Sequence, residues 1–136
     1  MDKPVKILLL THGGWGKSLL RGIQMILGSV DCVHEIALLP AYTLPEYMNM
    51  VREYTDTISD KSVIMTDLLG GTPSNVAASI GNQTGIHVFS GLNAPMLLEA
   101  CVEFSSGDEL DYDAILDAGM GACVDVVATV KANMSK

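Results

Sequence analysis

Cysteine is scarce and scattered in this chain. Cys32, Cys101 and Cys123 are odd in number and show no C-x-x-C spacing. Disulfide frameworks and zinc knuckles both depend on paired cysteines at defined spacings. The pattern therefore excludes a disulfide-stapled scaffold and favours a reducing cytoplasm.

Positive charge is also in short supply. Eight Lys and Arg stand against sixteen Asp and Glu, which gives a formal net charge of −8. Phosphate backbones are bound by clusters of Lys and Arg, and the only arginines here are Arg21 and Arg52. No nucleic-acid partner is expected.

Long apolar runs and a leader are missing as well. No apolar stretch reaches the roughly 20 residues that span a bilayer, and the amino terminus lacks a basic region followed by an apolar stretch and a cleavage site. The chain also has no linker or low-complexity tract, and 49% of it is hydrophobic. We expect a cytoplasmic protein in which residues 1–136 form a single domain with a sizeable core.

What the chain does contain is an alternation of short apolar runs and longer amphipathic segments. This pattern is typical of βα units around a parallel sheet. Strands are predicted at about residues 6–11, 33–39, 62–66 and 86–90. The expected fold is a three-layer, doubly wound α/β sheet with strand order 2-1-3-4.

Helix signals fall between these runs. Thr43 and Glu46 have the capping-box spacing, and Thr72 is predicted to cap a helix in which Pro73 takes the first position. Another helix is predicted over residues 110–120. Residues 124–130 alternate in a half-buried strand pattern, which predicts a last strand that runs antiparallel at a sheet edge or pairs with another subunit.

A histidine and an aspartate stand at the ends of two predicted strands. His12 ends the first strand before a Gly-Gly turn, and Asp67 follows the third strand. With strand order 2-1-3-4 these strands are neighbours, and their carboxyl ends flank the crevice where open α/β sheets bind ligands. Asp67 can then hold one ring nitrogen of His12 and leave the other free to attack an electrophile.

The residues after Asp67 complete this candidate site. Gly70 and Gly71 let the backbone approach a ligand closely, and Thr72 stands at a helix start, where backbone amides favour anions. The set of His12, Asp67, Gly70, Gly71 and Thr72 has the parts needed to receive, hold and pass on a phosphoryl group. No metal or other cofactor is expected.

Nucleotide binding is the alternative at the first loop. Residues 11–18 read T-H-G-G-W-G-K-S, which nearly matches the P-loop pattern G-x-x-x-x-G-K-[ST]. The first glycine is replaced by Thr11, however, a β-branched residue poorly suited to a phosphate-wrapping turn. The match also leaves His12 without a role.

Three blocks give the chain its resemblance to a known family. They are T-H-G at residues 11–13, D-L-L-G-G-T-P-S-N at 67–75 and S-G-L-N-A-P-M-L-L-E at 90–99. In order and spacing they resemble the IIA components of the mannose, fructose and sorbose family of the sugar phosphotransferase system. The resemblance covers essentially the whole chain.

The resemblance implies roles for these residues. His12 corresponds to the phosphorylated histidine, with Nε2 as the acceptor and Nδ1 facing Asp67, and Thr72 corresponds to the hydroxyl that contacts the phosphoryl oxygens. It also implies a homodimer that exchanges its carboxyl-terminal strand.

The resemblance further implies a phosphotransferase with a phosphohistidine intermediate. The donor is the phosphocarrier HPr, the acceptor is a IIB component on a separate polypeptide, and membrane IIC and IID components carry the sugar. A regulatory phosphorylation-dependent binding module of the same fold, or the related subunit of dihydroxyacetone kinase, remains an alternative. The sequence does not name the sugar, because the membrane components of this family bind it.

Overall fold

The computed structural model describes residues 2–107 and 109–135, and it places four parallel strands in one sheet. The strand order is β2-β1-β3-β4, as predicted. The strands are β1 (Ile7–His12), β2 (Val33–Leu38), β3 (Val63–Thr66) and β4 (His87–Ser90).

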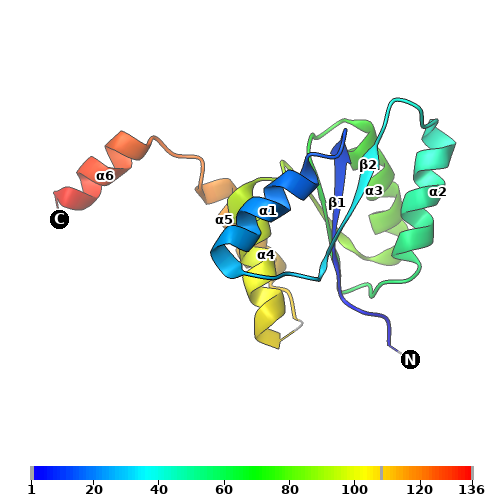
Figure 1. Ribbon diagram of the computed structural model, residues 1–136, viewed down its shortest axis with the longest axis horizontal. Helices are drawn as coiled ribbons and strands as arrows, with labels where there is room; N and C mark the ends of the chain where they lie inside the picture. Colours follow the sequence, from blue (N-terminus) through cyan, green and yellow to red (C-terminus); the bar gives the residue numbers. More distant parts are fainter. Residues whose placement is uncertain (1, 108, 136) are drawn as a thin grey trace.

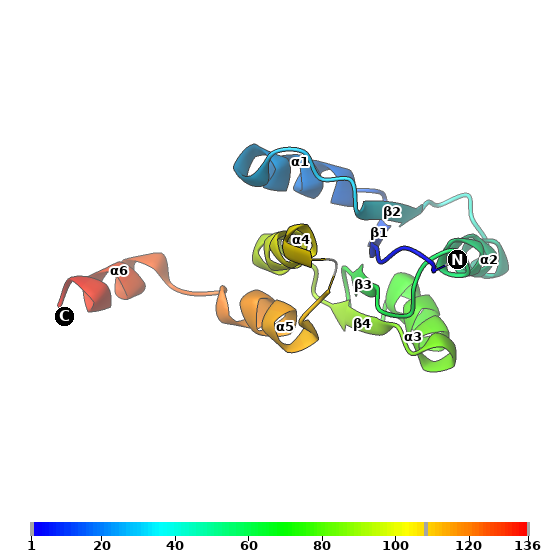
Figure 2. The ribbon, with the colours of Figure 1, turned by 90° about the horizontal axis from the view of Figure 1, so that it is seen from below.

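Helices cover both faces of this sheet and make the three predicted layers. Helices α1, α4 and α5 lie on one face, and α2 and α3 lie on the other (Figures 1 and 2). Their bounds are α1 (Gly16–Leu27), α2 (Leu44–Thr55), α3 (Thr72–Thr84), α4 (Ala94–Gly107) and α5 (Tyr112–Gly121).

Strand β1 is the centre of the core. Successive side chains of a strand point to opposite faces, so Ile7 and Leu9 pack toward α1, α4 and α5, while Leu8 and Leu10 pack toward α2 and α3. All four are fully buried. Each such burial stabilises the fold by about 1.5–3 kcal/mol, which explains why the run is continuously apolar.

The register of the sheet brings two loops together. Leu10 of β1 pairs with Thr66 of β3, so the residues that leave these strands emerge side by side at the carboxyl edge. His12 and Asp67 therefore become neighbours although 55 residues separate them.

Two predicted helix starts have different outcomes. The capping box is present: Thr43 Oγ1 accepts from the Glu46 amide at 3.2 Å, and the Thr43 amide donates to Glu46 Oε1 at 2.9 Å. The prediction that Thr72 caps the next helix is wrong. Gly71 is extended there and its carbonyl accepts from the Asn75 amide at 3.0 Å, so Thr72 is already the first residue of α3.

The prediction of a last strand is also wrong. Residues 124–130 form no edge strand, and helix α6 (Val126–Met134) occupies most of this segment. The Asp125 side chain accepts from the Ala128 amide at 2.9 Å and begins the helix, a local signal that the valine alternation concealed. Helix α6 has no buried residue and projects away from the rest of the molecule (Figure 1).

Within the described residues, no helix combines the length and the apolar character that crossing a membrane requires.

Candidate functional site

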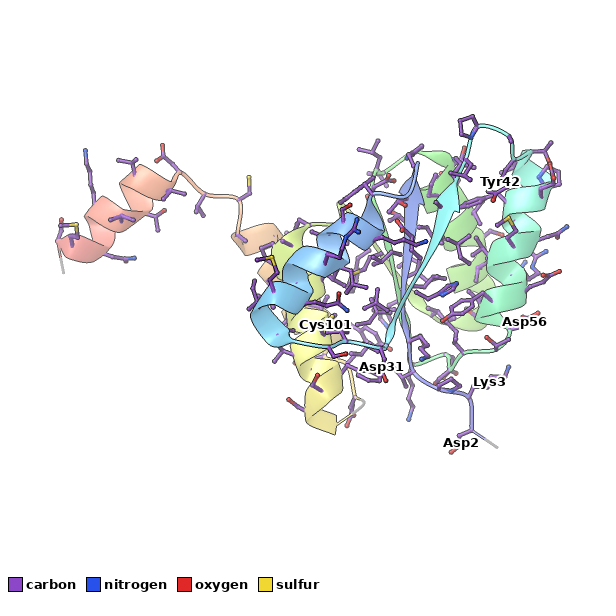
Figure 3. All side chains as sticks on the ribbon, viewed as in Figure 1. Asp2, Lys3, Asp31, Tyr42, Asp56 and Cys101 are labelled. Atoms are coloured by element: carbon purple, nitrogen blue, oxygen red, sulfur yellow. The ribbon has the colours of Figure 1, made fainter. Side chains whose placement is uncertain are left out.

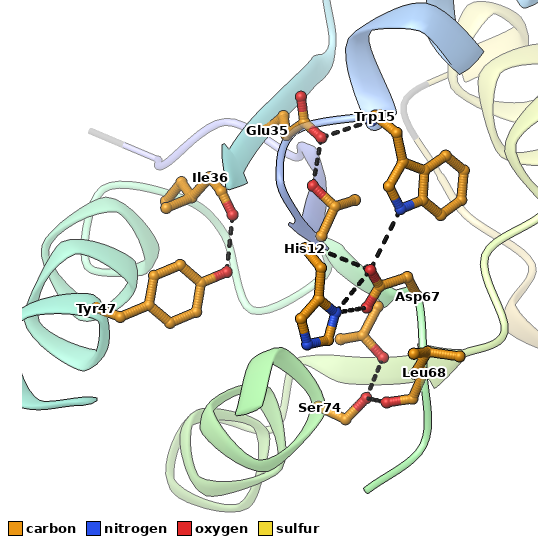
Figure 4. A network of polar contacts seen from close by, with 11 residues as sticks. His12, Trp15, Glu35, Ile36, Tyr47, Asp67, Leu68 and Ser74 are labelled. Carbon is orange, nitrogen blue, oxygen red and sulfur yellow. Dashed lines mark hydrogen bonds and ion pairs between the residues drawn. The ribbon is translucent and has the colours of Figure 1, made fainter. Parts of the chain in front are cut away.

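His12 and Asp67 form a hydrogen-bonded pair at the carboxyl edge of the sheet (Figure 4). His12 Nδ1 lies 2.9 Å from Asp67 Oδ2 and 3.1 Å from Oδ1, and the His12 amide donates to Oδ2 at 2.7 Å. An ionised carboxylate only accepts hydrogen bonds, so Nδ1 carries the proton and donates. In the neutral form of the ring the lone pair is then on Nε2, on a side chain that is 44% exposed.

The charge on Asp67 is stabilised where it stands. Burial by itself raises the pKa of this carboxyl, but hydrogen bonds from the His12 amide, the His12 ring and the Trp15 indole outweigh that effect, and the pKa is lowered below its ordinary value. The Trp15 Nε1–H donates to Oδ2 at 3.3 Å. Asp67 is therefore a fixed negative charge behind the ring.

The two glycines after Asp67 serve different purposes. Gly70 has a φ of +85°, a conformation that side chains rarely adopt, but a Cβ there would meet nothing. Gly71 has ordinary backbone angles, yet a Cβ there would lie 2.9 Å from His12 Cε1. Gly70 makes the turn, and Gly71 allows the start of α3 to lie against the imidazole.

A buried pair of hydroxyls holds this loop beneath the ring. Ser74 Oγ donates to the Leu68 carbonyl at 2.5 Å and lies 2.5 Å from Thr66 Oγ1. Ser74 is only 7% exposed, and its contact with the Leu68 carbonyl ties the turn to the first part of α3 (Figure 4).

Thr72 and His12 share one open cleft. The cleft measures about 530 Å³ and is mainly apolar. Its lining residues are His12, Gly13, Leu38, Leu39, Pro40, Tyr42, Leu44 and Thr72. A cleft of about 690 Å³, lined by Asp2, Lys3 and Asp56 among others, lies at the opposite end of the sheet from Tyr42 (Figure 3).

In the loop that resembles a P-loop, a carboxylate of the protein itself occupies the position where a phosphate would bind. The Glu35 carboxylate accepts hydrogen bonds from the amides of Gly16 and Lys17 at 2.7 and 3.1 Å. A phosphate would need these amides at the helix start. An internal carboxylate in that place is incompatible with the nucleotide-binding interpretation.

The structure thus brings together His12, Asp67, Gly71 and Thr72, with Gly70 shaping the loop from outside. Sequence reasoning missed the roles of Trp15 and Glu35. The signal for Glu35 was a charged residue in the middle of an apolar strand run, because such a group needs hydrogen-bond partners when it is partly buried. The described residues hold no group of three or more His, Cys, Asp and Glu that could bind a metal.

Comparison with known proteins decides the family. The family described as "PTS system fructose IIA component" matches residues 6–117. The chain belongs to this family. Its members are the IIA components of the mannose, fructose and sorbose type of the sugar phosphotransferase system.

Individual relatives agree with that assignment. This IIA component is 30% identical over 100 residues to the sorbose-specific EIIA component of Lacticaseibacillus casei, with 72% of each chain covered. It is 32% identical over 117 residues to the mannose-specific EIIAB component of Escherichia coli K12, and the match covers 82% of this chain. The chain spans only 35% of that longer relative.

A solved structure shares the fold of this IIA component closely. The phosphotransferase system component EIIA from Streptococcus agalactiae superposes with a TM-score of 0.79 at 27% identity. The superposition covers 91% of this chain and 98% of the other.

Proposed function

We propose that this IIA component is a cytoplasmic phosphoryl carrier of sugar uptake, with His12 as the residue that is transiently phosphorylated. It accepts the phosphoryl group from phosphorylated HPr and passes it to a IIB component, which serves IIC and IID components in the membrane. The single observation that carries this proposal is the 2.9 Å contact between His12 Nδ1 and Asp67 Oδ2, because it occupies Nδ1 and makes Nε2 the nitrogen that can attack, on a side chain that is 44% exposed.

The chemical step needs only the residues already described. The Nε2 lone pair attacks phosphorus, the bond from phosphorus to the donor breaks, and its electron pair stays with the donor. The ring becomes positively charged as the new N–P bond forms, and Asp67 stabilises that charge through Nδ1–H. The reverse sequence of bond changes delivers the phosphoryl group to IIB and restores the neutral ring.

The start of α3 is the proposed cradle for the phosphoryl oxygens. The cap residue Gly71 makes no side-chain bond to this helix start, so the amides of Thr72 and Ser74 remain able to donate to an anion, whereas Pro73 has no N–H. The helix dipole adds positive potential there. Gly71 brings this helix start against the ring. Thr72, which lines the same cleft as His12, supplies a hydroxyl, and Gly70 sets the turn.

The surface around His12 suits docking of protein partners. Exposed apolar side chains gather at this edge: Leu39 and Leu44 line the cleft, and Leu68 and Leu69 follow Asp67. Large exposed apolar groups around a reactive centre are typical of interaction sites. HPr and IIB are therefore proposed to bind here in turn, since both must reach the same Nε2.

We also propose a homodimer in which the carboxyl-terminal segment packs on the partner subunit. Support comes from α6, whose residues are all exposed on their own chain. Val126, Val127, Val130 and Met134 fall within an arc of about 100° on this helix and leave it with an unpartnered apolar face.

Intact-mass analysis tests the proposed function. The protein is mixed with phosphoenolpyruvate, enzyme I and HPr, and the phosphorylated residue is mapped under conditions that preserve acid-labile phosphohistidine. We expect one added phosphoryl group on His12 and none on His12→Gln. Full labelling of His12→Gln, or no labelling of the wild-type protein by demonstrably phosphorylated HPr, would overturn the assignment.

A further inference from the structure

Glu35 makes three hydrogen bonds that the proposed phosphoryl transfer does not use. It lies in β2, opposite Leu9 of the central strand. Its carboxylate accepts from Thr11 Oγ1 at 2.5 Å, from the Gly16 amide at 2.7 Å and from the Lys17 amide at 3.1 Å. A partly buried charge with three donors of this kind is a built feature of the fold.

Helix α1 depends on this carboxylate for its start. The residue at its N-cap position, Trp15, makes no side-chain capping bond, and the first turn contains no acidic residue. Glu35 provides from the neighbouring strand the acceptor and the negative charge that a helix start favours. Gly16 makes room for it, because a Cβ at that position would overlap the carboxylate.

Both ends of the reactive turn are attached to this one group. Thr11 directly precedes His12, and Gly16 directly follows Trp15. Between His12 and Trp15 lie Gly13 and Gly14, with φ of +73° and +89°, which have no side chains; the Gly13 amide donates to the Leu38 carbonyl at 2.9 Å. Glu35 therefore adds to this backbone bond the side-chain anchor that positions the His12 ring and the Trp15 indole toward Asp67 (Figure 4).

We propose that Glu35 is a positioning residue for phosphoryl transfer at His12, acting through the turn at residues 12–15 without touching the phosphoryl group. This inference rests on the proposed function. Transfer requires the attacking nitrogen to be aligned with the donor, and displacement by about 1 Å can cost about 100-fold in rate. The donor itself binds to the exposed surface of the edge, so its affinity does not depend on Glu35.

The test is a rapid-quench measurement of transfer from phosphorylated HPr as a function of HPr concentration. Glu35→Gln keeps the shape of the side chain but replaces one accepting oxygen by an NH₂ group. That group donates hydrogen bonds and cannot accept them from the Thr11 hydroxyl or the backbone amides. We expect its maximal rate to fall about 10- to 100-fold, with the half-saturating HPr concentration unchanged. Glu53→Gln, an exposed site on α2, removes the same charge and should keep the wild-type rate.

A second pair of variants serves if Glu35→Gln fails to fold. Thr11→Val keeps the side-chain shape and removes the hydroxyl that donates to Glu35, whereas Thr11→Ser retains that hydroxyl. We expect Thr11→Val to lower the maximal rate and Thr11→Ser to restore most of it. Equal maximal rates in these two variants, or a wild-type maximal rate in folded Glu35→Gln, would overturn the inference.

The fluorescence of Trp15 tests the role of Glu35 independently of the proposed function. It is the only tryptophan of the chain, so intrinsic fluorescence reports on the turn without any phosphoryl chemistry. Release of the turn in Glu35→Gln should shift the emission to the red and increase quenching by acrylamide. An unlabelled wild-type protein would refute the phosphoryl-carrier proposal, whereas unchanged Trp15 fluorescence in Glu35→Gln would refute the attachment of the turn to Glu35.

Discussion

At the scale of single residues, the site depends on which atoms already have partners. Asp67 accepts from the His12 amide, the His12 ring and the Trp15 indole, so it is committed to orienting the ring. His12 lines the open cleft, and the absence of a side chain at Gly71 leaves room beside its ring. Nδ1 of His12 is thus hydrogen-bonded to Asp67, and Nε2 is the nitrogen proposed to react.

Asp67→Asn tests the role of the hydrogen bond between Asp67 and His12 Nδ1. In the proposed transfer the Asp67 charge stabilises the phosphorylated ring. The amide removes that charge but leaves His12 in place, so we expect the transfer rate to fall about 10- to 100-fold while labelling still reaches completion. Single-turnover kinetics with phosphorylated HPr measure this. Asp56→Asn at the other end of the molecule (Figure 3) is the control, and a wild-type rate in Asp67→Asn would show that Asp67 has no part in transfer.

Gly71→Ala tests the close approach to the ring. Its Cβ would lie 2.9 Å from His12 Cε1, so the ring must move, and we expect the transfer rate to fall by about 100-fold. Gly70→Ala meets nothing and carries only backbone strain of about 1–2 kcal/mol, so it should lower the unfolding temperature more than the rate. The account would be contradicted if Gly70→Ala slowed transfer more than Gly71→Ala.

At the scale of elements, much of the arrangement could be predicted. The apolar runs identified all four strands, and the parallel order placed His12 beside Asp67. The exact start of α3 could not be predicted, because Gly71 caps through its backbone, which leaves no side-chain signal. The last segment was mistaken because the alternation of Val124, Val126, Ala128 and Val130 suggests a strand, while the capping Asp125 begins a helix.

Glu35 shows why the remainder of the site was not foreseen. Its partners are two backbone amides and Thr11, and the pairing requires β2 to lie beside β1 with a particular register. No motif spacing encodes such a contact. The same is true of the bond from Trp15 to Asp67, which links α1 to the end of β3.

The Asp67 contacts join the ends of β1 and β3, so they also contribute to stability in a pH-dependent way. The pKa of Asp67 is lowered in the folded state. Its stabilisation is therefore complete above the ordinary aspartate pKa of about 3.9 and is lost as pH falls through the lower folded value. The free energy of unfolding of the wild-type protein should exceed that of Asp67→Asn near neutral pH, and the difference should shrink in strong acid.

Urea unfolding at a series of pH values measures this difference. A gap between the two proteins that stays constant from neutral pH into strong acid would contradict the assignment of a lowered pKa to Asp67.

At the scale of the whole molecule, the proposed reactive surface and the proposed dimer surface lie apart. His12 and the apolar cleft lie at the carboxyl edge of the sheet, whereas α6 projects from the side that carries α5 (Figures 1 and 2). Because α6 has no buried residue, packing against its own chain adds little to its stability. We therefore expect the proposed dimer to leave both His12 side chains accessible to partners.

Val130→Asp tests the proposed dimer. A charge on the apolar face of α6 should be buried against the partner subunit without a counter-charge, so we expect the variant to sediment as a monomer while the wild type sediments as a dimer. Ala132→Asp adds the same charge to the opposite face of the helix and should stay dimeric. A wild-type monomer at micromolar concentration, or a dimeric Val130→Asp, would refute α6 as the dimer contact.

In the proposed transfer, Asp67 holds Nδ1 of His12 and Nε2 accepts the phosphoryl group. The most direct measurement is a long-range ¹H–¹⁵N correlation NMR spectrum of the phosphorylated protein, which distinguishes the two ring nitrogens of His12. The account predicts phosphorus on Nε2, with Nδ1 still protonated and bonded to Asp67. Phosphorus on Nδ1 would contradict it, because that nitrogen would have to leave Asp67 before it could react.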